Sequence, residues 1–194
     1  MQIQKGYAVM HRVDEAFQTI GRADFLPDAV KDEADIDAPL PIGYGQTNSQ
    51  PSTVRQMLIW LDPHPGEKVL DVGAGSGWTS ALLAYLVGPD CNVLTVEKVP
   101  ELVKFGAENC RRAGIRNAGF FAAADAYGLP DFAPYDRILV SAAASRLPLE
   151  LLDQLKPGGR IVIPVQNSIH VVDKTSGDGY KDTEHPGYVF VPLV

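Results

Sequence analysis

The most direct indication of a ligand site is a group of three closely spaced glycines, Gly73, Gly75 and Gly77. They follow the apolar residues 69–72 and precede a helix-forming segment, residues 79–86. Glycine allows a sharp backbone turn and leaves no Cβ in the way of a ligand. The free N–H groups and the positive dipole end of the helix would face that ligand. The pattern predicts a strand, a turn and a helix that hold a nucleotide-like molecule; a tight turn without a ligand is the alternative.

The spacing of these glycines narrows the class of ligand. The dinucleotide fingerprint places its third glycine five residues after the first, whereas Gly77 lies four residues after Gly73. Trp78 occupies the next position. The loop therefore resembles the G-x-G-x-G loop of S-adenosylmethionine-dependent methyltransferases and predicts that cofactor.

Carboxylates follow the next two predicted strands. Glu97 ends the apolar segment 92–97, where a carboxylate can accept hydrogen bonds from both ribose hydroxyls of a nucleoside. The alternative is a helix-end charge for the helix that begins near Pro100. Asp125 follows the segment 119–122, and it either accepts from an adenine amino group or is an ordinary loop aspartate.

Strand and helix patterns alternate through the middle of the chain, which predicts a parallel sheet with helices on both faces. The strands are expected near 68–72, 92–97, 118–122, 136–141 and 159–165, and the helices near 77–88, 99–113 and 148–155. The predicted fold class is α/β, a Rossmann-like doubly wound sheet.

The two ends of the chain add further elements. Apolar spacing predicts a helix over residues 9–20, and the proline- and glycine-rich residues 39–51 predict a loop. A helix is expected over 51–61, with Ser49 as a candidate cap. Two strands, 169–173 and 188–193, suit an antiparallel hairpin at the C-terminus.

Composition limits the remaining possibilities. A length of 194 residues fits one domain. The net charge is −7 and no basic block is present, which disfavours nucleic-acid binding. No apolar run reaches the ~20 residues that span a bilayer, and residues 1–5 lack a signal core, so we expect a cytoplasmic protein without a membrane contact. No metal site is predicted, since the histidines are scattered and the two cysteines, Cys91 and Cys110, lack metal-ligand spacing.

Several segments together resemble the protein-L-isoaspartate O-methyltransferase family, over nearly the whole chain. The most specific is Pro41-Ile-Gly-Tyr-Gly-Gln-Thr-Asn-Ser-Gln-Pro51, which looks like the family's hallmark loop. Residues 22–27 are similar to its R-x-x-F-V-P motif. Residues 133–143, 154–164 and 190–193 are similar to its later strands and its terminal motif.

The resemblance implies methyl transfer from S-adenosylmethionine to the free carboxylate of L-isoaspartyl and D-aspartyl residues in damaged proteins, the first step of their repair. It implies one methyltransferase domain over 1–194, with 1–50 as the N-terminal helix and active-site loop region. It places these residues at the cofactor: Gln46, Thr47, Asp71, Gly73, Ala74, Gly75, Gly77, Glu97, Lys98, Asp125 and Ala126.

Ser49 is the candidate catalytic residue of the acceptor side. An isoaspartyl carboxylate is already ionised at neutral pH, because its unperturbed pKa is about 3.9. The protein therefore needs no general base, and a hydroxyl such as that of Ser49 could orient the carboxylate. The other interpretation is that Ser49 only caps the helix that follows. Tyr44 is either a core residue or an acceptor contact.

Departures from the family pattern lie mainly on the acceptor side. Asp35, Asn48 and Ala124 differ from the residues expected there, and both termini are shorter than in many members. Two rival functions stay open: a methyltransferase of the same fold with another acceptor, and a family member that binds the cofactor without turnover. The sequence does not determine the oligomeric state.

Overall fold

The computed structural model describes residues 2–177 and 179–193 and consists of helices packed on a central sheet. The helices are α1 (Gln2–Thr19), α2 (Pro51–Leu61), α3 (Trp78–Val87), α4 (Pro100–Arg112) and α5 (Leu149–Asp153), with short 3-10 helices at η1 (Arg22–Phe25), η2 (Asp28–Glu33) and η3 (Pro130–Phe132). The strands are β1 (Leu40–Gly43), β2 (Gln46–Asn48), β3 (Val69–Val72), β4 (Val93–Glu97), β5 (Ala118–Ala122), β6 (Tyr135–Val140), β7 (Leu155–Val165), β8 (Ser168–Lys174) and β9 (Tyr180–Pro186).

Seven strands form the central sheet in the order β5-β4-β3-β6-β7-β8-β9. The strands from β5 to β7 are mutually parallel, and β8 and β9 are antiparallel. The prediction of a mostly parallel α/β sheet with antiparallel C-terminal strands is confirmed. The chain reverses its direction of travel across the sheet between β3 and β6, and ligands of such sheets bind at the carboxyl ends of the strands beside that point.

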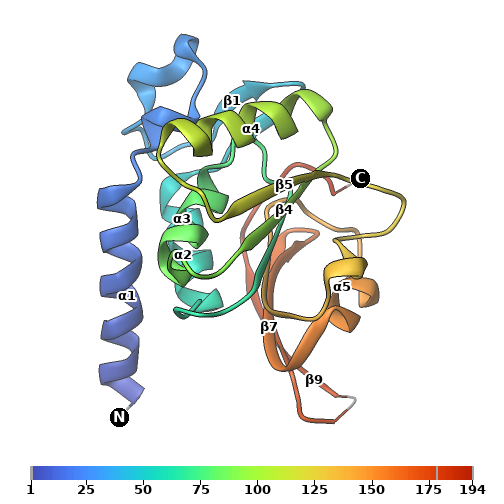
Figure 1. Ribbon diagram of the computed structural model, residues 1–194. Helices are drawn as coiled ribbons and strands as arrows, with labels where there is room; N and C mark the ends of the chain where they lie inside the picture. The colour runs from blue at the N-terminus through green and yellow to red at the C-terminus, as the bar shows by residue number, and fades with distance from the viewer. Residues whose placement is uncertain (1, 178, 194) are drawn as a thin grey trace.

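Each face of the sheet has its own apolar core, because side chains alternate between the faces along a strand. Val69 of β3 packs with α1, α2 and α3 on one face, and the next residue, Leu70, packs with α5 on the other. Figure 1 shows α1 to α3 on one side of the sheet and α5 on the opposite side.

The segment 39–51 was predicted to be a loop, and that prediction is wrong in part. It contains the antiparallel hairpin of β1 and β2, whose tip is Gly43-Tyr44-Gly45. All three tip residues have positive φ, at 89°, 56° and 71°. The sequence did not indicate the hairpin, because Gly43 and Gly45 form the sharp turn and only short stretches on either side of it pair.

The predicted capping of α2 by Ser49 is also wrong. Gln50 occupies the N-cap position, and no N-cap side chain makes a capping hydrogen bond. The carboxylate of Asp37 instead accepts the backbone N–H of Ser52 at 2.9 Å. That hydrogen bond, followed by those from the side chains of Ser52 and Gln50, lowers the pKa of Asp37. A residue distant in the sequence does the capping, so the hydroxyl of Ser49 is left for another role.

Other element ends differ from their predicted positions. Helix α1 begins at Gln2 rather than Val9, and β7 begins at Leu155, before Gly158. The last strand is β9, whereas residues 188–193 run beyond the sheet and meet the segment after β6 through a bridge between Ala143 and Pro192. The prediction of a strand at 188–193 is wrong because the alternating apolar residues there pack against other elements rather than pair along β8.

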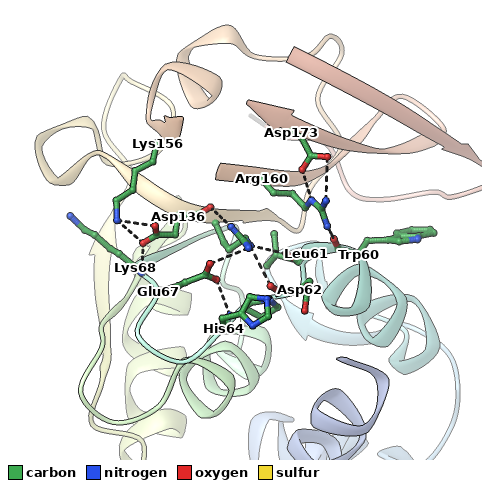
Figure 2. A network of polar contacts seen from close by, with 12 residues as sticks. Trp60, Leu61, Asp62, His64, Glu67, Lys68, Asp136, Lys156, Arg160 and Asp173 are labelled. Carbon is green, nitrogen blue, oxygen red and sulfur yellow. Dashed lines mark hydrogen bonds and ion pairs between the residues drawn. The ribbon is translucent and has the colours of Figure 1, made fainter. Parts of the chain in front are cut away.

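Charged side chains gather where β3 and β6 begin. Lys156 pairs with Asp136 at 2.7 Å, Arg137 with Glu67 at 3.0 Å and Arg160 with Asp173 at 2.6 Å, as Figure 2 shows for part of this network. Hydrogen bonds from Arg137 and Arg160 to the carbonyls of Leu61 and Trp60 tie the end of α2 to the sheet. None of the described helices combines the length and the apolar character that a membrane crossing requires.

Candidate functional site

A cavity of about 550 Å³, the large cavity, opens at the carboxyl ends of β3, β4 and β6. Its volume lies within the range of small-molecule sites in proteins, about 300–1,000 Å³. Its lining brings together ten of the twelve residues that the sequence predicted as site residues: Gln46, Thr47, Ser49, Gly73, Ala74, Gly75, Glu97, Lys98, Asp125 and Ala126. Segments separated by as many as eighty residues in the chain therefore meet at one site.

Residues 73–77, the glycine loop, bend between β3 and α3. Gly73, Gly75 and Gly77 have φ values of 80°, 53° and 85°, which residues other than glycine rarely adopt. A Cβ on Gly75 would lie 3.0 Å from Cδ1 of Ile42 in β1. A side chain at this position would therefore crowd Ile42, and glycine lets the loop lie close to β1 while Gly75 lines the large cavity.

Gly77 lies against α4 and outside the cavity lining. A Cβ there would lie 2.8 Å from the carbonyl oxygen of Gly106, and a Cβ on Gly106 would lie 3.1 Å from the carbonyl oxygen of Gly75. The third glycine of the motif thus permits close packing of loop and helix. Gly106 was not singled out from the sequence, since a lone glycine within a helix gives no motif.

Glu97 is the buried charged residue among those that line the large cavity. Its side chain is 8% exposed and lines the large cavity. Oε2 accepts the backbone N–H of Gly75 at 2.9 Å, and Oε1 accepts the backbone N–H of Val99, the N-cap residue of α4, at 2.9 Å. Because a carboxylate oxygen accepts more than one hydrogen bond, these contacts leave acceptor capacity for a ligand. The helix-end contact suggested by the sequence is present and does not exclude ribose binding.

Asp71 lies behind the glycine loop and does not line the large cavity. Like Val69, it faces α3, where its Oδ2 accepts hydrogen bonds from the hydroxyls of Thr79 at 2.9 Å and Ser80 at 2.6 Å. Complete burial raises the pKa of Asp71 to about 6, against the opposing effect of these hydroxyls. The structure therefore places this predicted cofactor residue where it braces the start of α3.

The lining of the large cavity includes the exposed residues Lys98, Asp125 and Ala126. Lys98 and Asp125 lie in the segments that follow β4 and β5. Their exposure matches a rim that a ligand covers, whereas Glu97 lies deeper in the site.

A second cavity of about 300 Å³, the small cavity, adjoins the large one. Four residues line both, namely Thr47, Ser49, Ser141 and Val191. Three of these carry hydroxyls, and no side-chain hydrogen bond joins any of the three hydroxyls to another residue within 2–177 or 179–193. The shared wall therefore presents hydroxyl groups to whatever lies in either cavity.

Sequence reasoning missed several of these lining residues. Ser141 directly follows β6, and its position after an apolar strand was a signal that could have been used. The tail residues 191–193 gave no signal, because only the tertiary fold returns them to the site. Within the described ranges, no group of three or more histidine, cysteine, aspartate or glutamate side chains is placed to hold a metal ion.

A sheet that reverses at β3 and β6, with a glycine loop after β3 and a carboxylate ending β4, defines the S-adenosylmethionine-dependent methyltransferase fold. The family model described as protein-L-isoaspartate(D-aspartate) O-methyltransferase matches residues 1–194. The chain belongs to this family.

Relatives of known name agree with this assignment. The chain is 46% identical over 194 residues to the protein-L-isoaspartate O-methyltransferase of Methanopyrus kandleri, covering 97% of this chain and 86% of the relative. It is 45% identical to that of Pyrococcus abyssi over 94% of this chain and 86% of the relative.

Solved structures show the same fold. A protein-L-isoaspartate O-methyltransferase superposes with a TM-score of 0.87 at 27% identity, covering all of this chain and 64% of that one. A second, from Plasmodium falciparum and in complex with S-adenosyl-L-homocysteine, has a TM-score of 0.81 at 23% identity, covering 94% of this chain and 90% of that one.

Proposed function

We propose that this chain transfers a methyl group from S-adenosylmethionine to the free carboxylate of L-isoaspartyl and D-aspartyl residues in damaged proteins, the step that initiates their repair. The observation that carries the proposal is the wall of hydroxyls shared by the two cavities. The large cavity would hold the cofactor, and the small cavity would admit the acceptor residue. Thr47, Ser49 and Ser141 stand between them.

The residues of the large cavity fit the cofactor. Gly73 and Gly75 line the cavity beside the place proposed for the cofactor, Glu97 would supply acceptors for the ribose hydroxyls, and Asp125 with Ala126 would border the adenine. S-adenosylmethionine, when bound, supplies an electrophilic methyl group. The protein's part is to hold the donor with its reactive side towards the shared wall.

The acceptor side fits a carboxylate better than an acceptor that must first lose a proton. A hydroxyl or protonated amine acceptor needs a base to remove its proton, and histidine is the commonest such base. No histidine among the described residues lines either cavity. A carboxylate is ionised already, and the hydroxyl of Ser49 would donate to its non-reacting oxygen and fix its orientation. Walls of small residues would exclude water from the aligned groups.

The proposal includes the whole chain as one domain, residues 1–194. Val9 and Val13 of α1 share an apolar core with α2, α3 and the sheet, which supports treating 1–50 as part of the same unit. Both cysteines are free thiols, which is compatible with a cytoplasmic setting.

The test is a methyl-transfer assay that compares an isoaspartyl peptide with its normal aspartyl twin. We expect methylation of the isoaspartyl peptide only. Methylation of a different acceptor would replace the proposed substrate, and cofactor binding without any transfer would indicate a binding protein.

The variant Ser49→Ala tests the acceptor side of the same proposal. Loss of a hydrogen bond to a charged group costs roughly 1.5–3 kcal/mol, so kcat/KM should fall by roughly 10–100-fold. Since no cap depends on Ser49, the melting temperature should stay unchanged. The matched control is Ser145→Ala, an exposed serine outside both linings. Full activity in Ser49→Ala would remove this residue from the mechanism.

A further inference from the structure

Arg22 is a buried cation that lies outside both cavities and has no role in the function proposed above. Its side chain is 6% exposed. None of the ion pairs among the described residues includes it, and burial, countered in part by the charge of Asp37, lowers its pKa. Removing a charge from water is costly unless hydrogen bonds compensate. The arrangement of those hydrogen bonds therefore indicates what the burial accomplishes.

The guanidinium of Arg22 gathers two separate backbone segments. Nη1 donates to the carbonyls of Ala34 at 3.2 Å and Ile36 at 2.9 Å, and Nη2 donates to that of Ala38 at 2.8 Å. Nη2 also donates to the carbonyl of Ser49 at 3.1 Å. One side chain thus fixes the segment 34–38 against Ser49, the candidate catalytic residue.

Asn48 extends this contact to the glycine loop. Arg22 Nε donates to Asn48 Oδ1 at 2.7 Å, and Asn48 Nδ2 donates to the hydroxyl of Ser76 at 2.9 Å. Nδ2 of Asn109 in α4 donates to the backbone carbonyl of the same Ser76 at 3.0 Å. Asn48 and Ser76 both line the large cavity and both are buried.

Trp78 gives a second contact between Arg22 and the cofactor side. The Arg22 guanidinium lies 5.5 Å from the centre of the Trp78 ring, and Trp78 lines the large cavity at the first position of α3. Arg22 therefore contacts both the segment that carries Ser49 and the helix that follows the glycine loop.

We propose that Arg22, acting through Asn48 and Ser76, is a positioning residue for methyl transfer that holds Ser49 at a fixed place relative to the glycine loop. This inference rests on the proposed function, because it concerns the alignment of the acceptor with the donor. Misplacement of reacting groups by about 1 Å can cost on the order of 100-fold in rate. We call the hydrogen bonds that join Arg22, Asn48 and Ser76 the link. Loss of the link should therefore lower kcat more than it lowers affinity for the cofactor.

Asn48 is the informative position for a test. Asn48→Leu removes both of its side-chain hydrogen bonds while keeping a side chain of similar size, and Ser76→Ala removes one of them from the other end. We expect each to lower kcat for an isoaspartyl peptide about tenfold, the effect of one lost hydrogen bond. In the double variant the two effects should not add, because both break the same bond. Additive effects, or unchanged kcat per folded molecule, would overturn the proposal.

The conservative variant Arg22→Lys separates positioning from stability. Arg22 bonds six acceptors, since Nη2 also donates to the backbone carbonyl of Asn48 at 3.2 Å. Lysine keeps the charge but has no planar fork with which to reach all of them. We expect kcat of Arg22→Lys to fall more than kcat of Asn48→Leu. In Arg22→Lys, the fold-change in the dissociation constant of S-adenosylhomocysteine, measured by calorimetry, should be smaller than the fold-change in kcat. The matched control is Arg12→Lys, because Arg12 also bonds a backbone carbonyl, that of Pro63 at 2.7 Å, and neither residue lines a cavity. If Arg12→Lys lowers kcat equally at equal loss of melting temperature, Arg22 has only a structural role.

A measurement without turnover keeps this inference distinct from the proposed function. In the parent protein, S-adenosylhomocysteine should slow hydrogen exchange of the amides at 34–38, a segment that does not line the large cavity. The slowing should disappear in Asn48→Leu. If the parent methylates no isoaspartyl peptide but this exchange pattern holds, the acceptor proposal fails and the link stands. If the parent is active but the exchange is unaffected, the link fails alone.

Discussion

The two ends of the central sheet of this protein use charge in opposite ways. Where β3 and β6 begin, acids and bases are paired, as with Lys156 and Asp136 in Figure 2. Where the same strands end, none of the ion pairs among the described residues includes a residue of the large cavity. Glu97 is held there by backbone N–H groups, not by a cation.

This difference separates stability from ligand binding. A paired carboxylate has its charge neutralised by the protein, whereas a carboxylate held by neutral N–H groups keeps acceptor capacity and charge for a ligand. Substitutions at one end should therefore change the free energy of unfolding, and matched substitutions at the other should change cofactor affinity.

The largest effect is expected for Gly75→Val. Valine at φ 53° is strained, and its Cβ would lie 3.0 Å from Ile42 Cδ1, so the glycine loop or the Ile42 side chain must shift. We expect the affinity for S-adenosylhomocysteine to fall on the order of 100-fold or more in calorimetric titration. Gly66→Val is the control, since Gly66 has φ 90° with open space around it at the other end of the sheet. It should lower the melting temperature and leave the affinity intact; unchanged affinity in Gly75→Val would refute the role of the loop.

Asp71→Asn should alter the pH dependence of stability. Because burial raises the pKa of Asp71 in the folded state to about 6, above the usual value near 3.9, ionisation disfavours folding. The stabilisation of the protonated form is fully present below about pH 4 and is lost as the pH rises through about 6. The parent should lose on the order of 3 kcal/mol relative to the variant across this window. Denaturant titrations from pH 4 to 7 measure this, and parallel curves for the two proteins would contradict it.

Glu97→Ala should weaken cofactor binding, whereas the matched variant Glu67→Ala, at the opposite end of the sheet, should not. Loss of hydrogen bonds to a charged acceptor costs roughly 1.5–3 kcal/mol, which is a loss of affinity of roughly 10–100-fold. The counterpart is Glu67→Ala, since Glu67 also accepts a backbone N–H, that of His64 at 2.8 Å, and pairs with Arg137. Equal affinities in the two variants would mean that Glu97 serves only the end of α4.

The smallest effect is expected for Lys156→Met. Burial opposes the ionisation of Asp136, but hydrogen bonds from Lys156 and from the backbone of Lys68 outweigh it and lower its pKa. Lys156 is 42% exposed, so the pair should contribute less than about 1 kcal/mol and should weaken in high salt. Melting curves at two salt concentrations test this, and kcat should not change. A change in kcat would show that the two ends of the sheet are coupled.

The sequence alone determined the local elements of the site. The strand, glycine loop and helix around residues 69–87 are specified by contiguous residues, because each torsion and each hydrogen bond there involves near neighbours. The same is true of Glu97 at the end of β4. The hallmark segment 41–51 carried the family assignment, and its residues Gln46, Thr47 and Ser49 do line the large cavity.

Part of what was missed could still have been inferred from strand alternation. Asp71 shares a face of β3 with Val69, so the period of two already directs it towards α3 and away from the ligand. The motif alone concealed this, since it names residue types and not the faces they occupy.

The tertiary structure alone decided which distant residues complete the site. Asp37 caps α2 in place of Ser49, Arg22 joins the segment 34–38 to Ser49, and the tail residue Val191 reaches the wall between the cavities. These contacts span from 12 positions, between Arg22 and Ala34, to more than 100, between Val191 and Ser49, and no local preference encodes them. They form because buried carbonyls and N–H groups must find partners once the apolar faces of the helices have packed on the sheet.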